Sequence, residues 1–357
     1  MHSSPKFTAI WQATEGGADW PQFPWVKRVF EPYISEHIFD GKHQVVKDNV
    51  IVFDAWVYSN DPEYYKKFKG KNAFLVHIGD EYYELGADRY VNFRGVFRMI
   101  WTSVFNPEHV MTFPLGSYIR ELPSRVLPAT ERRYAWSFIG DAGKVSRVDM
   151  VRAMSSIEPH ICYSSSPVGG VTFFERNATG KRRIPFHEFY GILGDSVFAP
   201  APMGNASIES CRPYDALEMG AIPIVEKRLT LDYYKGLLGD HPLPVVSSWA
   251  EGRSLVRSLI NDPASLTALQ QTCQQWWASY QARLIANIGS FLERRSNASD
   301  DLVPLRSNLP KMPYWQYLEL LRHHNIPALG RRVSRQLTRL VQDKKWRVST
   351  RTGVPVK

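Results

Sequence analysis

Short apolar runs recur along the chain, with segments of helical character between them. Eight runs have the length of strands and are flanked by turn residues: 49–57, 73–79, 109–116, 134–140, 160–163, 196–202, 221–225 and 243–248. Continuous apolar character is typical of strands buried on both faces of a parallel sheet. Helices are predicted in the intervening segments 60–70, 145–156, 209–219 and 263–288. Strands that alternate with helices predict right-handed βαβ units and doubly wound sheets.

The segment 120–133, "RELPSRVLPATERR", is the expected linker, because it holds two prolines and many charges and has no periodicity. A chain of 357 residues is long enough for two domains with separate cores. We expect an N-terminal α/β domain over 1–125, a second α/β domain over 126–290, and a C-terminal helical extension over 291–357. A cleft between two such domains is the expected ligand site, near the carboxyl ends of the strands.

Composition narrows the class of protein. Hydrophobic residues make up 44% of the chain and aromatic residues 13%, which argues against disorder. No apolar run is long enough to predict a transmembrane helix, and the N-terminal sequence lacks the pattern of a signal peptide. The three cysteines are widely spaced, which argues against a disulfide framework and a thiolate zinc site. We therefore expect a cytoplasmic protein, with the Golgi lumen as the alternative if an N-terminal anchor has been removed.

The net charge of +9 is concentrated near the C-terminus, because residues 331–357 hold nine basic residues and one acidic residue. In that tail Val333, Leu337, Leu340 and Val341 fall on one helical face. A basic amphipathic helix is suited to an anionic membrane surface, such as the inner face of a membrane, or to an anionic polymer. The alternative is a terminal helix packed on the first domain. Nucleic acid is not expected as a partner, since aromatic residues are not interleaved with the charges.

The stretch 205–225, "NASIESCRPYDALEMGAIPIV", combines a polar loop, a short helix and a buried strand. Pro213 belongs in the first turn of a helix, so we expect the helix to begin at about Glu209 or Ser210, with Ser207 or Ser210 as N-cap. It should end at Met219, before Gly220. Unpaired N–H groups at its N-terminus, together with the Arg212 guanidinium, would suit a diphosphate. Asp215 could accept hydrogen bonds from a ribose diol. The alternative is an ordinary capped helix with a surface Arg and Asp.

The motif "SIESCRPYDALEMGAIPIV" resembles the nucleotide-sugar signature of exostosin-like glycosyltransferases. Three further segments are similar to parts of that family: "FYGILGDSVFAPAPMGNAS" (189–207), "RRYAWSFIGDAGKVSR" (132–147) and "FPLGS" (113–117), the last as in related ribitol-phosphate xylosyltransferases. The resemblance covers about residues 109–260. It implies the GT-B fold, in which two Rossmann-like α/β domains face each other across a cleft, the first binding the acceptor and the second the nucleotide sugar.

The resemblance also implies roles for individual residues. Asp215 takes the ribose-binding position, and Arg212 takes the diphosphate position with the preceding loop. Lys144 and Arg147, after the turn at Gly140, are candidates for a second phosphate contact. The donor-binding candidates from the loop are Asn205, Ser207, Glu209 and Ser210. The family's retaining branch has a glutamate where this chain has Ser207, and Glu209 lies two residues too late to replace it cleanly, so we expect inversion at the anomeric carbon.

An inverting transferase needs one base for the acceptor hydroxyl and positive charge for the leaving phosphates. No Asp-x-Asp motif occurs in the chain, so we expect no divalent metal and no cofactor besides the UDP-sugar donor, with Arg212 and Lys144 facing the leaving group. The best candidates for the base are Asp80 and Glu81, at the end of a predicted strand; they could instead cap the next helix. Asp54 is a rival within another strand.

The sequence thus predicts a hexosyl- or pentosyltransferase that moves a sugar, such as xylose or another pyranose. The expected acceptor is a polysaccharide, a glycan or a polyol-phosphate polymer. The alternative is a non-catalytic carbohydrate-binding or scaffold protein that has the same fold.

Overall fold

The computed structural model describes residues 6–13, 20–54, 62–79, 90–101, 106–143, 145–164, 172–173, 184–204, 207–227 and 232–298. The chain divides into two compact units, Met1–Met312 and Pro313–Lys357. The second unit, which contains the predicted basic amphipathic helix, lies outside the described residues. Within the described ranges, none of the helices has the length and apolar character needed to cross a membrane.

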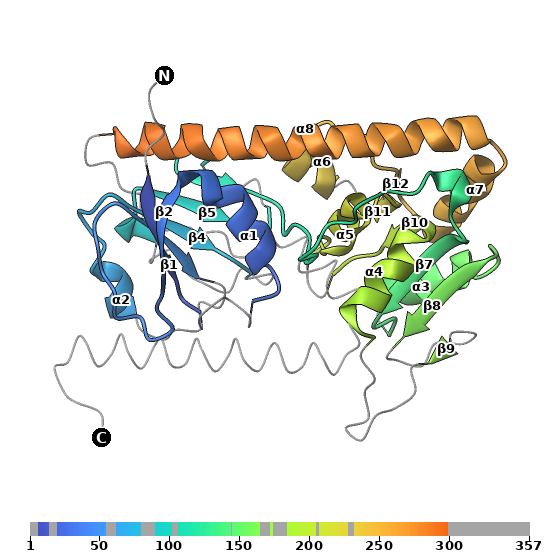
Figure 1. Ribbon diagram of the computed structural model, residues 1–357, viewed down its shortest axis with the longest axis horizontal. Coiled ribbons are helices and arrows are strands. Elements are labelled where there is room, and N and C mark those ends of the chain that lie inside the picture. Colours follow the sequence, from blue (N-terminus) through green and yellow to red (C-terminus); the bar gives the residue numbers. More distant parts are fainter. Residues whose placement is uncertain are drawn as a thin grey trace. The chain divides into compact units, whose positions relative to one another are not determined.

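The first domain is built on a six-stranded parallel sheet in the order β2-β1-β3-β4-β5-β6 (Figure 1). Its strands are β1 (Phe7–Trp11), β2 (Ile34–Phe39), β3 (Val50–Asp54), β4 (Ala73–His77), β5 (Gly95–Arg98) and β6 (Val110–Thr112). β1 pairs with both β2 and β3, so the direction in which the chain adds strands reverses beside β1. β3 and β4 are buried along their whole length, as their continuous apolar sequences predict.

The second domain carries another six-stranded parallel sheet, in the order β12-β11-β10-β7-β8-β9. Its strands are β7 (Tyr134–Gly140), β8 (His160–Ser164), β9 (Thr172–Phe173), β10 (Ser196–Ala201), β11 (Ile222–Glu226) and β12 (Val245–Val246). The strand order reverses between β7 and β10, which is the topological switch point of a Rossmann-like sheet. The predicted fold class, two doubly wound α/β domains of the GT-B type, is confirmed by these two sheets.

All eight predicted strands are present, and the structure adds four that the apolar runs did not indicate: β1, β2, β5 and β9. β2 mixes polar and apolar residues at the edge of its sheet, and two of its side chains are exposed. β5 has only four residues and starts with a glycine. Neither β2 nor β5 has the continuous apolar run by which the other strands were predicted.

The described helices are α1 (Phe23–Phe30), α2 (Pro62–Lys66), α3 (Val145–Met154), α4 (Phe186–Gly194), α5 (Arg212–Glu218), α6 (Tyr233–Leu238), α7 (Trp249–Ile260) and α8 (Pro263–Ser296). Short 3-10 helices occur at Glu31–Tyr33, Tyr90–Asn92 and Ala129–Glu131. The predicted helix over 263–288 is therefore longer at its C-terminal end, and it passes the domain limit predicted at residue 290.

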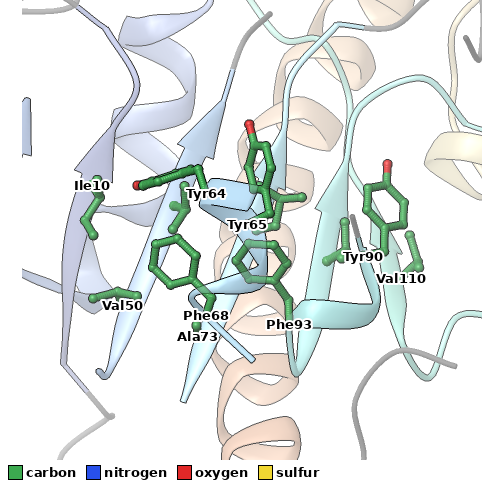
Figure 2. Packing of buried hydrophobic residues seen from close by; sticks show 12 residues of the cluster. Ile10, Val50, Tyr64, Tyr65, Phe68, Ala73, Tyr90, Phe93 and Val110 are labelled. Atoms are coloured by element: carbon green, nitrogen blue, oxygen red, sulfur yellow. The ribbon is translucent and has the colours of Figure 1, made fainter. Parts of the chain in front are cut away.

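The core of the first domain is rich in aromatic rings (Figure 2). Tyr64 and Phe68 contact each other edge to face, with ring centroids 5.2 Å apart, and Phe68 stacks on Phe93 at 5.5 Å. These rings pack with Val50 and Val52 of β3, and none of these side chains is exposed. Each buried ring of this kind contributes about 1.5–3 kcal/mol through removal of apolar area from water.

The long helix α8 contacts elements of both domains (Figure 1). Near its start, the Gln270 side chain accepts a hydrogen bond from the backbone N–H of Ala129 and donates to the carbonyl of Gly220. Near its end, Phe291 packs on Phe97 of β5 with centroids 4.9 Å apart. The last turns of α8 thus belong to the packing of the first sheet, although they follow the whole second domain in the chain.

Candidate functional site

A partly open pocket lies at the switch point of the second sheet. It is lined by residues of β7 and β10, including Phe138, by Phe189 of α4, and by Arg212 and Asp215 of α5. The two charged residues come from one face of α5, and nearly all of the remaining lining is apolar. Doubly wound sheets place their ligands at this kind of position, outside the carboxyl ends of the strands on either side of the switch point.

Arg212, the first residue of α5, supplies a positive charge to the pocket. Its guanidinium carbon lies 4.8 Å from the centroid of the Phe138 ring, a cation–π arrangement. A Cβ atom at Gly140 would come within 2.5 Å of Nη2, so the glycine at the end of β7 leaves the space that the guanidinium occupies. Arg212 makes no hydrogen bond or salt bridge with any residue that the structure describes. Its guanidinium therefore lines the pocket without an acceptor among the described residues.

Asp215 lies one turn further along α5 and is 2% exposed. Its Oδ1 accepts hydrogen bonds from the Ser117 hydroxyl at 2.7 Å and from the backbone N–H of Tyr118 at 2.8 Å. Burial raises the pKa of Asp215 to about 7, against the opposing effects of these two hydrogen bonds and of the nearby Arg212 charge. The carboxyl group thus titrates near neutral pH, and its charged form is the one that Ser117 and Tyr118 stabilise.

The start of α5 differs from the prediction. The helix begins at Arg212 rather than at Glu209 or Ser210, and its N-cap is Cys211, whose side chain makes no capping hydrogen bond. Ser207 instead accepts a hydrogen bond from the backbone N–H of Glu209, a local turn within the loop. Pro213 has no N–H to offer. Because few backbone donors remain at this helix end, the Arg212 side chain is the main candidate for an anion contact.

Glu209 is enclosed by protein donors, and only 1% of its surface is exposed. Its Oε1 accepts hydrogen bonds from the backbone N–H of Leu115 and from the Tyr214 hydroxyl, at 2.7 and 2.6 Å. Its Oε2 accepts one from Tyr233 at 2.7 Å. The carboxylate therefore ties the segment after β6 to the second domain, and a contact between Glu209 and a donor stays a prediction.

The other predicted donor-binding residues have varied positions. Arg147 is buried, and its guanidinium donates to the backbone carbonyls of Asp141 and Met203. Ser210 is buried, and its hydroxyl has no hydrogen-bond partner within the described part of the chain. Lys144 and Asn205 lie outside the described residues. The structure thus brings Arg212 and Asp215 to one pocket and Gly140 next to the Arg212 side chain, while donor contacts from all the predicted residues stay predictions.

The proposed catalytic bases, Asp80 and Glu81, also lie outside the described residues. The strand before them is in place, and its last residue, His77, forms a buried cluster with Tyr90 and Arg98. The rival base, Asp54, is buried at the end of β3 and accepts a hydrogen bond from the Tyr65 hydroxyl. The described residues contain no group of three or more His, Cys, Asp or Glu side chains that could hold a metal ion.

Ser117 and Tyr118 are contacts of Asp215 that the sequence did not predict as site residues. They belong to "FPLGS" and the residue after it, which the sequence offered only as a mark of resemblance. Ser117 and Asp215 are 98 positions apart in the chain, so local sequence spacing could not predict their hydrogen bond. The sequence does contain one indication of this contact: a small polar residue, Ser117, follows a glycine between a predicted strand and the predicted linker.

No family model matches the chain, and no curated protein matches it. The resemblance to exostosin-like transferases therefore stays a prediction. Among solved structures, the chain is similar to an α1,3-fucosyltransferase, with 13% identity over 85% of this chain and 94% of that one, and a TM-score of 0.48.

The chain is also similar to the T4 phage BGT in complex with its UDP-glucose substrate, with 8% identity over 82% of this chain and 100% of that one, and a TM-score of 0.46. For TarM the identity is 10% over 68% and 55% of the two chains, with a TM-score of 0.43. These identities lie below 25% and the TM-scores below 0.5, so they assign neither an activity nor a substrate to this chain.

Proposed function

We propose that this protein is a glycosyltransferase that takes its sugar from a UDP-linked donor, bound in the pocket at the switch point of the second sheet. The observation that carries the proposal is the position of Arg212. A guanidinium with no acceptor among the described residues lies beside the partly ionised Asp215, in a pocket that is otherwise mainly apolar. Such a pocket offers a cation for the diphosphate, a carboxylate for the ribose diol and apolar walls for the base.

The reaction that fits this arrangement is a single displacement with inversion. A base of the first domain takes the proton of an acceptor hydroxyl, for which Asp80 and Glu81 are the candidates. The acceptor oxygen then forms a bond to the anomeric carbon, while the bond from that carbon to the diphosphate oxygen breaks and UDP leaves with the electron pair. Positive charge that is already fixed beside the leaving group, as on Arg212, stabilises this transition state.

The sugar and the acceptor are the finer parts of the proposal. We propose a pyranose donor, xylose or a hexose, and an acceptor that is a glycan or a polyol-phosphate polymer, as the sequence resemblance implies. The proposal includes no metal ion. The other candidate, a carbohydrate-binding protein without turnover, shares the donor pocket and differs only in whether UDP is released.

Binding of UDP to the full chain, measured by titration calorimetry, tests the donor site. We expect Arg212→Ala to weaken UDP binding by about 10- to 100-fold, since hydrogen bonds to charged groups contribute roughly 1.5–3 kcal/mol. Arg152→Ala is the matched control, because that arginine is exposed on α3 and its nearest partner is Asp149 at 4.0 Å. If both variants bind UDP as the unchanged protein does, the donor site lies elsewhere.

Release of UDP from UDP-xylose and UDP-glucose, with and without a glycan acceptor, tests catalysis. We expect turnover in the unchanged protein and a lower kcat with unchanged UDP affinity in Asp80→Asn or Glu81→Gln. UDP binding without any release of UDP from either donor would favour the non-catalytic alternative.

A further inference from the structure

The segment 113–119 leaves the first sheet after β6 and is held on both sides. On the first-domain side, Trp25 of α1 donates a hydrogen bond from Nε1 to the carbonyl of Pro114 at 3.0 Å. On the second-domain side, the backbone N–H of Leu115 donates to Glu209 at 2.7 Å. Two consecutive residues of the segment, 114 and 115, are thus fixed by bonds to different domains. These two bonds restrict the positions of the next residues, among which Ser117 and Tyr118 contact Asp215 of α5.

Ser117 of this segment has no exposed surface. Its hydroxyl oxygen accepts a hydrogen bond from the backbone N–H of Ile119 at 3.0 Å and donates its own hydrogen to Asp215 Oδ1 at 2.7 Å. A serine hydroxyl has one hydrogen to donate, so the bond from Ile119 directs that hydrogen toward the carboxylate. The carboxylate is in turn held in one orientation at the wall of the pocket.

We infer that Ser117 is a positioning residue of the donor site, which holds the Asp215 carboxylate ionised and correctly oriented for the hydroxyl groups of the donor's ribose. The inference rests on the proposed function, since it assigns Asp215 to the ribose. It extends the site from the second domain to the segment that follows the first sheet. In this role Ser117 does not contact the donor itself and acts through Asp215.

A test by pH has to take account of all the groups that face Asp215. Arg212 of α5 and the Cys211 thiol just before it are two of these groups. The Tyr190 hydroxyl of α4, which lies near Arg120, is the third. The segment after β6 contributes the Ser117 hydroxyl and the Tyr118 N–H. Burial raises the pKa of Tyr190 and of Cys211, to about 12 for the thiol, so both stay neutral near pH 7. Asp215 is therefore the group of this cluster that titrates there.

The hydrogen bond from Ser117 is the largest of the effects that lower the pKa of Asp215 against its burial. Without it, the pKa rises further above about 7, and less of the carboxyl group is ionised at neutral pH. Ribose hydroxyls donate to the ionised form, so binding should weaken at pH 7 and recover at higher pH. A loss of packing alone would weaken binding equally at every pH.

The experiment is titration calorimetry of UDP with the full chain between pH 6 and 9. We expect Ser117→Ala to bind roughly tenfold more weakly at pH 7, with the midpoint of the pH dependence shifted upward. Asp215→Asn should show no such pH dependence. Ser146→Ala is the matched control, because it removes another buried serine that donates to a carboxylate, Glu226, at 2.7 Å. Its pH profile should equal that of the unchanged protein.

Ser117→Cys replaces Ser117→Ala if circular dichroism shows the alanine variant unfolded; the thiol is a weaker donor, so a smaller shift in the same direction is expected. A pH midpoint that stays in place in the folded variant overturns the role of Ser117, while Arg212→Ala still weakens UDP binding. If the unchanged protein binds no UDP, the proposed function fails, and the inference fails with it.

Discussion

Replacing Gly116 with alanine tests how tightly the segment between the two sheets is fixed. Gly116 has φ +67°, in the left-handed region that favours glycine. A Cβ atom built at this position would lie 2.1–2.2 Å from three ring atoms of Trp25. Trp25 cannot turn aside at low cost, because it is fully buried, stacks on Trp277 with centroids 5.5 Å apart, and donates to Pro114.

The expected cost has two parts. A residue with a side chain in the left-handed region costs about 1–2 kcal/mol, and an extra methyl group in a packed interior costs about 1–3 kcal/mol. The free energy of unfolding should therefore fall by about 2–5 kcal/mol. Gly70 provides the control: its φ of +82° is also left-handed, but a Cβ atom there meets nothing within 4 Å. Gly70→Ala should cost only the first part, about 1–2 kcal/mol.

Urea denaturation of the two variants and the unchanged protein, followed by tryptophan fluorescence and circular dichroism, measures the difference. We also expect Gly116→Ala to weaken UDP binding and Gly70→Ala to leave it unchanged, since Gly116 lies next to Ser117. Equal losses of stability in the two variants would refute the reasoning, because the contact with Trp25 would then carry no energy.

The remaining predictions concern buried charge. Because the pKa of Asp215 is raised from 3.8 to about 7, the native state keeps a proton that the unfolded chain has released. The free energy of unfolding should fall as the pH rises from about 4 to 7, and Asp215→Asn should remove that slope in denaturation experiments. Arg132→Ala should cost about 3 kcal/mol or more in urea denaturation, since it removes three hydrogen bonds that the buried guanidinium donates to the carbonyls of Leu127, Ser196 and Met219. Arg28→Met should cost about 2 kcal/mol, since it leaves the buried Glu218 carboxylate without its partner at 2.6 Å; a double-mutant cycle with Glu218→Gln measures the coupling.

Among the strands that the sequence predicts correctly are three that are buried along their whole length. β3, β4 and β10 are apolar along their length because helices or loops cover both faces of a parallel sheet. β2 was not predicted, because it is an edge strand in which polar and apolar residues are mixed. Four of the described helices, α2, α3, α5 and α8, were also predicted, but not all of their ends. α5 starts after the serines that were expected to cap it, because Ser207 bonds within its own loop.

The site was predictable only in its local part. The pairing of Arg212 with Asp215 follows from their spacing of three residues on one helix face, and both line the same pocket. The spacing could not predict which group each charged side chain contacts. Arg147 has the same chemistry as Arg212, yet its guanidinium is bonded to two backbone carbonyls. Whether a charge faces a pocket or the protein depends on which distant segments pack beside it, and that is set by the tertiary fold.

The three charged residues of α5 link the pocket to the first domain. Arg212 faces the pocket, Asp215 faces both the pocket and Ser117, and Glu218 binds Arg28 of α1 at 2.6 Å. A helix of seven residues moves as one body, so a ligand that shifts Arg212 or Asp215 also shifts the carboxylate that holds α1. Coupling between two sites is reciprocal. If the contact between Arg28 and Glu218 strengthens donor binding by some free energy, a bound donor strengthens that contact by the same free energy. The first domain, which is expected to hold the acceptor, would then be placed most firmly when the donor pocket is filled.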